Sequence, residues 1–191
     1  LWATNPLRKP EDIIDSLNNL GDATVDYSNY NTLIGTNPSI GTGQKNTGTG
    51  IQSLNNLLNG NENTAYGFKT LRANQQGNAN TAMGSEALSS NSTGVENTAV
   101  GYKALTNNQQ GSFNVAIGGK TLMTNNASNN TAMGMFSMEA NSSGYGNTAI
   151  GKSSLNQNTQ GFNNVAVGSD ALKTNLNGNF NVALGSNSAF D

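Results

Sequence analysis

The sequence predicts an all-β protein, a trimeric β-roll or β-solenoid shaft of 17-residue coils with a short N-terminal helix. A repeated phrase and an unusual composition predict it. The phrase, Asn-(Thr/Val)-Ala-x-Gly, recurs at a nearly fixed period of 17, with one residue lost before Asn130. It begins at Asn63, Asn80, Asn97, Asn114, Asn130, Asn147, Asn164 and Asn181, with weaker copies at Asn31 and Asn46. Such a period indicates stacked small units, which form shafts or surfaces more often than enzymes.

Composition narrows the function. Of 191 residues, 34% are hydrophobic and 10% are charged, and the balance is rich in Asn, Gly, Ser and Thr, which can stack in ladders of like residues. The net charge of −2 without a basic run argues against nucleic acid. The chain lacks Cys and His, and no apolar stretch reaches the ~20 residues of a membrane span. We therefore assign no catalytic, cofactor-binding or metal-binding residue, no cofactor and no membrane insertion.

Residues 1–29 precede the repeat and predict a separate docking or oligomerisation segment. A helix begins at Pro10, which suits the first helical position, and ends at Gly21. Its apolar residues share one face: Ile13, Ile14, Leu17 and Leu20. A helix this short needs a partner. The partner is either the same helix of other copies or a docking surface, and the alternative is a helix folded back to cap the first coil.

The rest of the chain divides into irregular entry coils at 30–62 and a regular shaft at 63–191. Each 17-residue unit is too short for a strand, a helix and two loops, and predicts two short strands with two turns. With the Asn of each phrase as position 1, positions 4 and 9 carry the large apolar residues and predict the core. Position 4 holds Tyr66, Met83, Val100, Ile117, Met133, Ile150, Val167 and Leu184. Position 9 holds Leu54, Leu71, Leu88, Leu105, Leu122, Met138, Leu155 and Leu172.

The small residues of the unit predict a close contact and turns. Position 3 is Ala from Ala65 to Ala183 and position 5 is Gly, so the face opposite position 4 packs very close to something. Asn at position 12 and Gly at position 15 are expected in turns that tolerate positive φ. Position 12 holds Asn74, Asn91, Asn108, Asn125, Asn141, Asn158 and Asn175. Position 15 holds Gly77, Gly94, Gly111, Gly144, Gly161 and Gly178.

The flat Ala/Gly face predicts a homotrimer. A coil that buries few apolar side chains needs a further contact, and the same face of identical chains around an axis supplies one. The alternative is a monomeric solenoid whose Ala and Gly point into a narrow interior.

The repeat resembles known families. The segment Asn-Thr-Ala-Val-Gly-Tyr-Lys-Ala-Leu-Thr-Asn-Asn-Gln-Gln-Gly (97–111) is similar to the repeats of bacteriophage and related viral tail-fibre proteins. In those proteins the array often precedes a self-cleaving chaperone domain, which this sequence lacks. Asn-Val-Ala-Ile-Gly (114–118) also resembles the head repeat of trimeric autotransporter adhesins, which form trimeric β-rolls.

These resemblances imply a structural and attachment protein, a trimeric tail fibre or spike segment of a virion. Its implied partners are the virion or tail baseplate, bound through the N-terminal segment, and a glycan or protein of the host surface. A bacterial surface adhesin head, located outside the cell, is an alternative. Charges at position 7 fit an exposed lateral surface with stacked opposite signs: Lys69, Glu86, Lys103, Lys120 and Asp170.

Three other hypotheses rest on particular columns. A glycan-cleaving enzyme needs converging carboxylates, but Glu62, Glu86, Glu96, Glu139, Asp170 and Asp191 are spread over the coils, with only Glu86 and Glu96 at all close. An ice- or crystal-binding surface would use Thr64, Thr81, Thr98, Thr131 and Thr148 at position 2, a column broken by Val115, Val165 and Val182. Sugar-stacking patches, or more simply packing between neighbouring turns, would use Phe68, Tyr102, Phe113, Phe136, Tyr145, Phe162 and Phe180.

Overall fold

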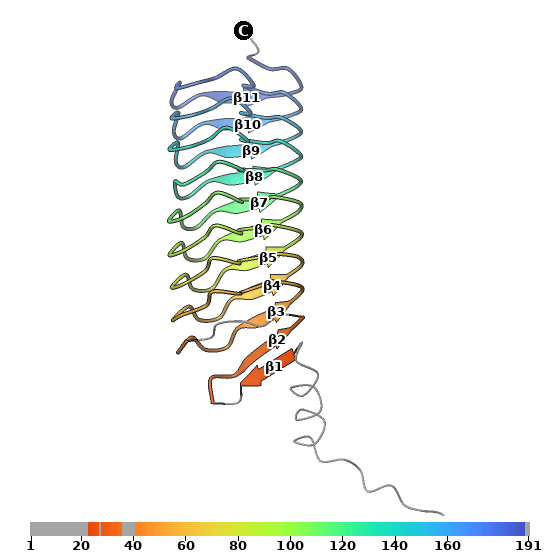
Figure 1. The fold of residues 1–191 in the computed structure, drawn as a ribbon. Helices are drawn as coiled ribbons and strands as arrows, with labels where there is room; N and C mark the ends of the chain where they lie inside the picture. The colour runs from red at the N-terminus through yellow and green to blue at the C-terminus, as the bar shows by residue number, and fades with distance from the viewer. Residues whose placement is uncertain (1–22, 27, 36–40, 190–191) are drawn as a thin grey trace, which may run out of the picture.

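The computed structural model describes residues 23–26, 28–35 and 41–189, which form a parallel β-solenoid (Figure 1). The helix expected at 10–21 lies outside the described residues. The coils stack along one axis as a narrow rod, and every coil contributes one short strand to a single sheet that runs the length of the rod. The all-β fold and the 17-residue coil predicted from the sequence are confirmed, but each coil forms one short strand and not the two that we expected.

The sheet contains eleven strands in chain order. The strands are β1 (Ala23–Asp26), β2 (Asn31–Ile34), β3 (Thr47–Thr49), β4 (Thr64–Tyr66), β5 (Thr81–Met83), β6 (Thr98–Val100), β7 (Val115–Ile117), β8 (Thr131–Met133), β9 (Thr148–Ile150), β10 (Val165–Val167) and β11 (Val182–Leu184). Strands β2 to β11 are parallel and pair like with like, so the repeated phrase fixes the register. Strand β1 pairs antiparallel with β2 and so precedes the parallel stack.

Backbone hydrogen bonds between coils continue around the turns. The amide of Leu88 donates to the Ala104 carbonyl at 3.0 Å, and the amide of Leu105 donates to the Thr121 carbonyl at the same distance. Gly101 N–H donates to the Met83 carbonyl at 2.8 Å. Because whole coils pair in this way, three-residue strands suffice to hold the stack.

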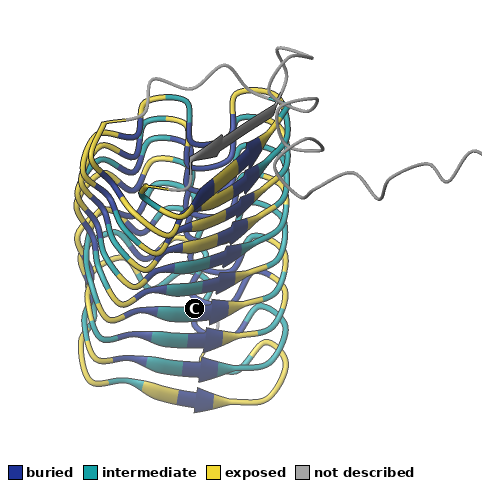
Figure 2. Ribbon diagram, turned by 90° about the horizontal axis from the view of Figure 1, so that it is seen from below, coloured by how far each residue is buried: buried dark blue, intermediate teal, exposed yellow. Residues whose placement is uncertain are grey.

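The interior is lined by positions 3 and 9. The residues at position 9 are buried, as predicted. The Ala at position 3 also points inward, since Ala65 to Ala183 are at most 5% exposed. Figure 2 shows this buried residue in the middle of the regular strands, flanked by more exposed ones. In the entry coils, position 3 is occupied by Leu33 and Gly48. A Cβ on Gly48 would lie 2.7 Å from Leu33 Cδ2, so the large Leu33 side chain fits because the next coil has Gly at this position.

The prediction that position 4 belongs to the core was wrong. Tyr66 is 60% exposed, Met83 51% and Leu184 69%. Successive side chains of a strand point to opposite faces. The narrow interior has room for Ala beside the position-9 Leu, so the larger residues on either side of Ala point outward. The Ala face is therefore not an outer contact surface, and the interior placement that we considered as the alternative is the observed one.

Two ladders of Asn run through the interior. At position 1, Asn97 Nδ2 donates to Asn80 Oδ1 at 3.1 Å and to the Gly111 carbonyl at 2.8 Å. At position 12, Asn108 Nδ2 donates to Asn91 Oδ1 at 3.0 Å and to the same carbonyl. Position 12 is thus a buried ladder as well as part of a turn, and each amide ties its own coil to the previous one.

The expected sites of positive φ were also wrong. The left-handed residues are at positions 7, 9 and 17, for example Lys103 at 56°, Leu105 at 51° and Phe113 at 59°, together with the position-5 Gly. The Gly residues at position 15 have ordinary φ. They are needed for space instead: a Cβ on Gly94 would collide with Asn91 Oδ1 and the Gly111 carbonyl.

The missing residue before Asn130 is absorbed in a turn. Ala127 takes the place of the position-15 Gly, and its carbonyl accepts from Asn114 Nδ2 and Asn125 Nδ2, each at 2.8 Å. Strands β7 and β8 keep their register, with Ala116 opposite Ala132. The deletion therefore leaves the sheet continuous.

Candidate interaction face

The outward side chains of β3 to β11 form a flat surface of two parallel columns, which we call the strand face. It consists of positions 2 and 4 of each coil. Position 2 holds Thr47, Thr64, Thr81, Thr98, Val115, Thr131, Thr148, Val165 and Val182, and position 4 holds Thr49 followed by the eight apolar residues from Tyr66 to Leu184. The sheet register aligns like positions between coils.

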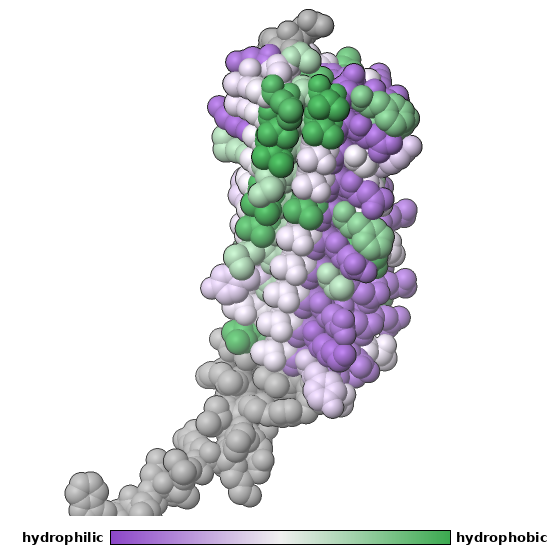
Figure 3. All heavy atoms as spheres, turned by 180° about the vertical axis from the view of Figure 1, so that it is seen from behind, coloured by the Kyte–Doolittle hydropathy of each residue, from purple (hydrophilic) through white to green (hydrophobic). Residues whose placement is uncertain are grey.

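The strand face becomes more apolar toward the C-terminal end of the rod (Figure 3). In β3 and β4 it presents three Thr and a Tyr, whereas β10 and β11 present only Val and Leu. Ile117 is 37% exposed, Ile150 39% and Leu184 69%. A long, largely exposed apolar column of this kind is unusual on a soluble monomer.

The predicted stacking of opposite charges at position 7 holds for one pair. Lys103 Nζ lies 3.7 Å from Glu86 Oε2 in the adjacent coil. A hydrogen bond with Tyr102, and then the Glu86 carboxylate, raise the pKa of Lys103. Lys69 lies over the Phe68 ring instead, with its Nζ 4.8 Å from the ring centroid.

The acidic side chains do not converge. Glu62 pairs with Lys45 at 3.0 Å, and Asp170 pairs with Lys173 at 2.8 Å. Glu139 accepts from Asn156 Nδ2 at 3.4 Å. Asp191 lies outside the described residues. In the part of the chain that the structure describes, no three acidic side chains gather as they would around a metal ion.

The aromatic side chains fall into two arrangements. Near the C-terminus, the rings of Tyr145 and Phe162 stack with centroids 4.9 Å apart, and Phe162 meets Phe180 edge to face at 5.2 Å. This is the packing between neighbouring turns that we expected. Tyr102 and Phe136 are two coils apart and line a small pocket.

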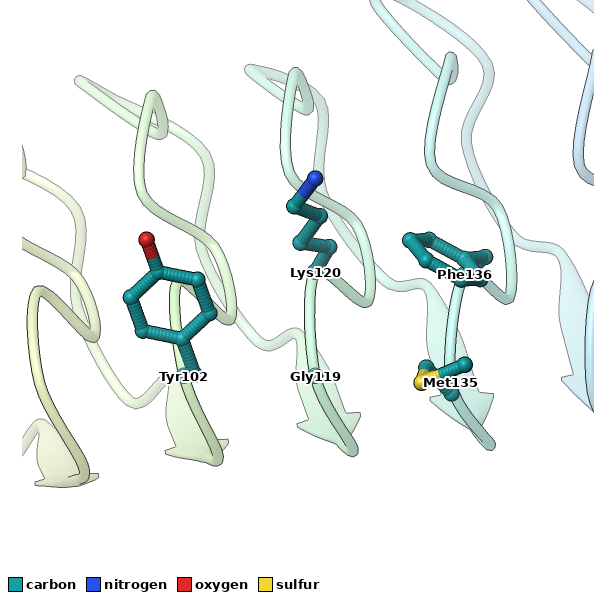
Figure 4. A pocket seen from close by; sticks show the side chains of 5 residues that line it. All are labelled: Tyr102, Gly119, Lys120, Met135 and Phe136. Atoms are coloured by element: carbon teal, nitrogen blue, oxygen red, sulfur yellow. The ribbon is translucent and has the colours of Figure 1, made fainter.

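A small pocket lies beside the strand face, where β6, β7 and β8 end. It has a volume of about 100 Å³ and is lined by Tyr102, Gly119, Lys120, Met135 and Phe136 (Figure 4). Tyr102 and Met135 are 50% and 48% exposed. Lys120 rises between Tyr102 and Phe136, with its Nζ 5.6 Å from the Phe136 centroid. Sequence reasoning singled out Tyr102, Lys120 and Phe136 separately but missed the pocket, because it depends on Gly119.

Comparison of the chain with known protein families, with curated proteins and with solved structures found no match. Within 23–26, 28–35 and 41–189, no helix has the length and apolar character needed to cross a bilayer.

Proposed function

We propose that the chain is a structural segment of a homotrimeric fibre and that the strand face is the surface through which its copies associate. The observation that carries this proposal is the apolar column at position 4, which runs along the rod from Tyr66 to Leu184 and is exposed except at the half-buried Val100 and Val167. Covering half-exposed Val, Ile, Met and Leu side chains is favourable at about 25 cal/mol per Å².

The gradient along the strand face favours parallel copies. When two rods lie side by side in the same direction, Val182 and Leu184 meet the same apolar coil of the neighbour. In opposite directions they would meet the polar coil of Thr47 and Thr49. Parallel copies related by rotation about a shared axis, which runs alongside the rods, form a shaft with distinct ends, as a fibre requires.

The narrowness of the face favours three copies over two. Positions 2 and 4 of a strand are about 6.6 Å apart, and eight intervals between coils span roughly 38 Å. A single face-to-face contact of this strip covers roughly 250 Å² per chain, about a third of the usual ~800 Å². In a closed ring, position 4 of each chain can face position 2 of the next, so every chain has two neighbours.

Light scattering tests the proposal directly. We expect a mass three times the 19.8 kDa of the chain. Replacing Ile150 and Val167 by Lys should yield a folded monomer, because six ammonium groups cannot be buried together. Replacing the exposed Gln157 and Gln160 by Lys adds the same charge away from the strand face and should leave the trimer intact. A monomeric native chain, or a trimer that tolerates Ile150→Lys with Val167→Lys, would refute the proposal.

The wider role follows from the same proposal. A trimeric shaft with a distinct N-terminal segment suits a viral tail fibre or spike that docks to a particle at 1–29 and contributes to host-surface adhesion. The bacterial adhesin head is the alternative for the same trimer. We infer no catalytic activity, since the carboxylates of the described array are dispersed.

A second candidate is a monomeric solenoid that binds an ice or crystal surface. It is favoured by the position of the Thr column, which lies on the exposed, flat strand face with Thr64, Thr81 and Thr98 in register. If the chain is a monomer, thermal hysteresis and its loss in Thr81→Val test this function.

A further inference from the structure

Gly119 differs from the other glycines in the described residues. The others either have positive φ or lie so close to neighbouring atoms that a Cβ would come within 3.0 Å of one of them. At Gly119 the φ is ordinary, and the nearest atoms to a Cβ would be Met135 Cγ at 3.8 Å and the Tyr102 carbonyl oxygen at 4.0 Å. The backbone therefore accepts any side chain at Gly119, and what the glycine provides is open space.

That space is the floor of the pocket beside the strand face. The position-6 residues of the coils before and after it are Tyr102 and Met135, which stand roughly 9.6 Å apart at their backbones, two coil spacings. A ring in van der Waals contact on both sides needs about 7–8 Å. The slot therefore accepts one ring, with its edge open to water.

We propose that this slot binds a carboxylated pyranose, the ring of an acidic glycan. The walls from Tyr102, Met135 and Phe136 are apolar and suit the C–H faces of a sugar. The open rim leaves the sugar hydroxyls hydrated. The Lys120 ammonium at the rim supplies the positive charge for the carboxylate.

Charge complementarity decides between acidic and neutral sugars. Lys103 is already paired with Glu86, whereas Lys120 has no ion pair with any described residue and its ammonium lies over the Phe136 ring. An ammonium that lies over a ring and has no carboxylate partner remains available to an anion. The proposal deepens the attachment function by naming a ligand class, and it rests on that function only for its biological use.

The chain contains a matched comparison. Ser169 also lies at position 6, two coils beyond Met135, and its position-6 neighbours are Lys152 and Ser186. A substitution at Ser169 therefore changes an equivalent position without touching Tyr102, Met135 or Phe136.

The experiment is saturation-transfer NMR on the full chain with D-glucuronate, N-acetylneuraminate and glucose. We expect binding of one or both acidic sugars, which also shows which acid is preferred, and about fivefold weaker binding of glucose, the effect of one exposed charge pair. Gly119→Met should weaken acidic-sugar binding at least about tenfold, since one filled contact is worth that much. Lys120→Gln should remove the preference for acidic sugars, and the control Ser169→Met should leave sugar binding unchanged.

Each contrary result overturns the proposal. The contrary results are that the native chain shows no saturation transfer to any of the sugars, that glucose binds as well as the acidic sugars, or that acidic-sugar binding survives Gly119→Met. Circular dichroism of Gly119→Met checks that the coil remains folded. Light scattering of the same samples reports trimer formation separately, so failure of the slot and failure of the trimer are distinguishable.

Discussion

The buried Asn ladder at position 1 should be a main source of stability, and Asn97→Ala tests it. The Asn97 side chain makes four hydrogen bonds. Its Oδ1 accepts from Asn114 N–H and Asn114 Nδ2, and its Nδ2 donates to Asn80 Oδ1 and the Gly111 carbonyl. Asn97 is 0% exposed, so the groups that lose these hydrogen bonds are buried.

The magnitude follows from which partners have a second bond. Asn80 Oδ1 still accepts from Asn97 N–H, the Gly111 carbonyl from Asn108, and Asn114 Nδ2 still donates to Ala127. Only the Asn114 N–H loses its sole partner. One orphaned buried donor costs about 1–3 kcal/mol and each of the three further lost bonds about 0.5–1.5 kcal/mol, so Asn97→Ala should lower the free energy of unfolding by about 2.5–7.5 kcal/mol.

Urea unfolding followed by circular dichroism at fixed protein concentration measures the effect. The control is Asn107→Ala in the same coil, because the Asn107 side chain is exposed and bonds to no described residue. It should change stability by less than about 0.5 kcal/mol. Equal effects of the two substitutions would refute the argument that the buried ladder holds the coils together.

Two further predictions concern single positions. Gly101→Ala should destabilise the protein by more than about 3 kcal/mol, because Gly101 has φ +130° and a Cβ there would lie 2.7 Å from the Gly118 carbonyl carbon. The control Gly119→Ala should leave stability unchanged in the same unfolding assay. Hydrogen bonds from Lys173 and then Ser169 hold the pKa of Asp170 below its ordinary 3.8, so its contribution to stability is present above pH 3.8 and is lost as the pH falls through the lowered pKa. Asp170→Asn should therefore be less stable than the native chain at pH 7 and equal to it in acid, and a pH-independent difference would contradict this.

The period and the Leu column were predictable from the sequence, because identical coils stacked in register must repeat their buried residues. The direction in which position 4 points was not. Size alone placed Met83 and Ile117 inside and Ala in a contact surface, whereas the inward-pointing residues of the strands beside Leu88 and Leu105 are Ala. The limited width of the coil decides which side chains point inward, and that width cannot be predicted from the sequence of one repeat.

The left-handed residues show a similar limit. Local preference assigns positive φ to Asn and Gly, but Lys103 and Leu105 adopt it because hydrogen bonding to both neighbouring coils fixes the turn. The pocket was hidden for a related reason. Tyr102, Gly119 and Met135 are separated by 16 or 17 residues, and only the coil register brings them together.

Parallel association through the strand face is the central claim, and a distance between spin labels tests it most directly. The chain has no Cys, so Leu184→Cys carries one label at the C-terminal end of the face. Parallel copies place these labels close to the shared axis, and pulsed electron resonance should give one distance below about 20 Å. A distance of roughly 40 Å, the length of eight coil spacings in an antiparallel pair, or no coupling between labels, would contradict the claim.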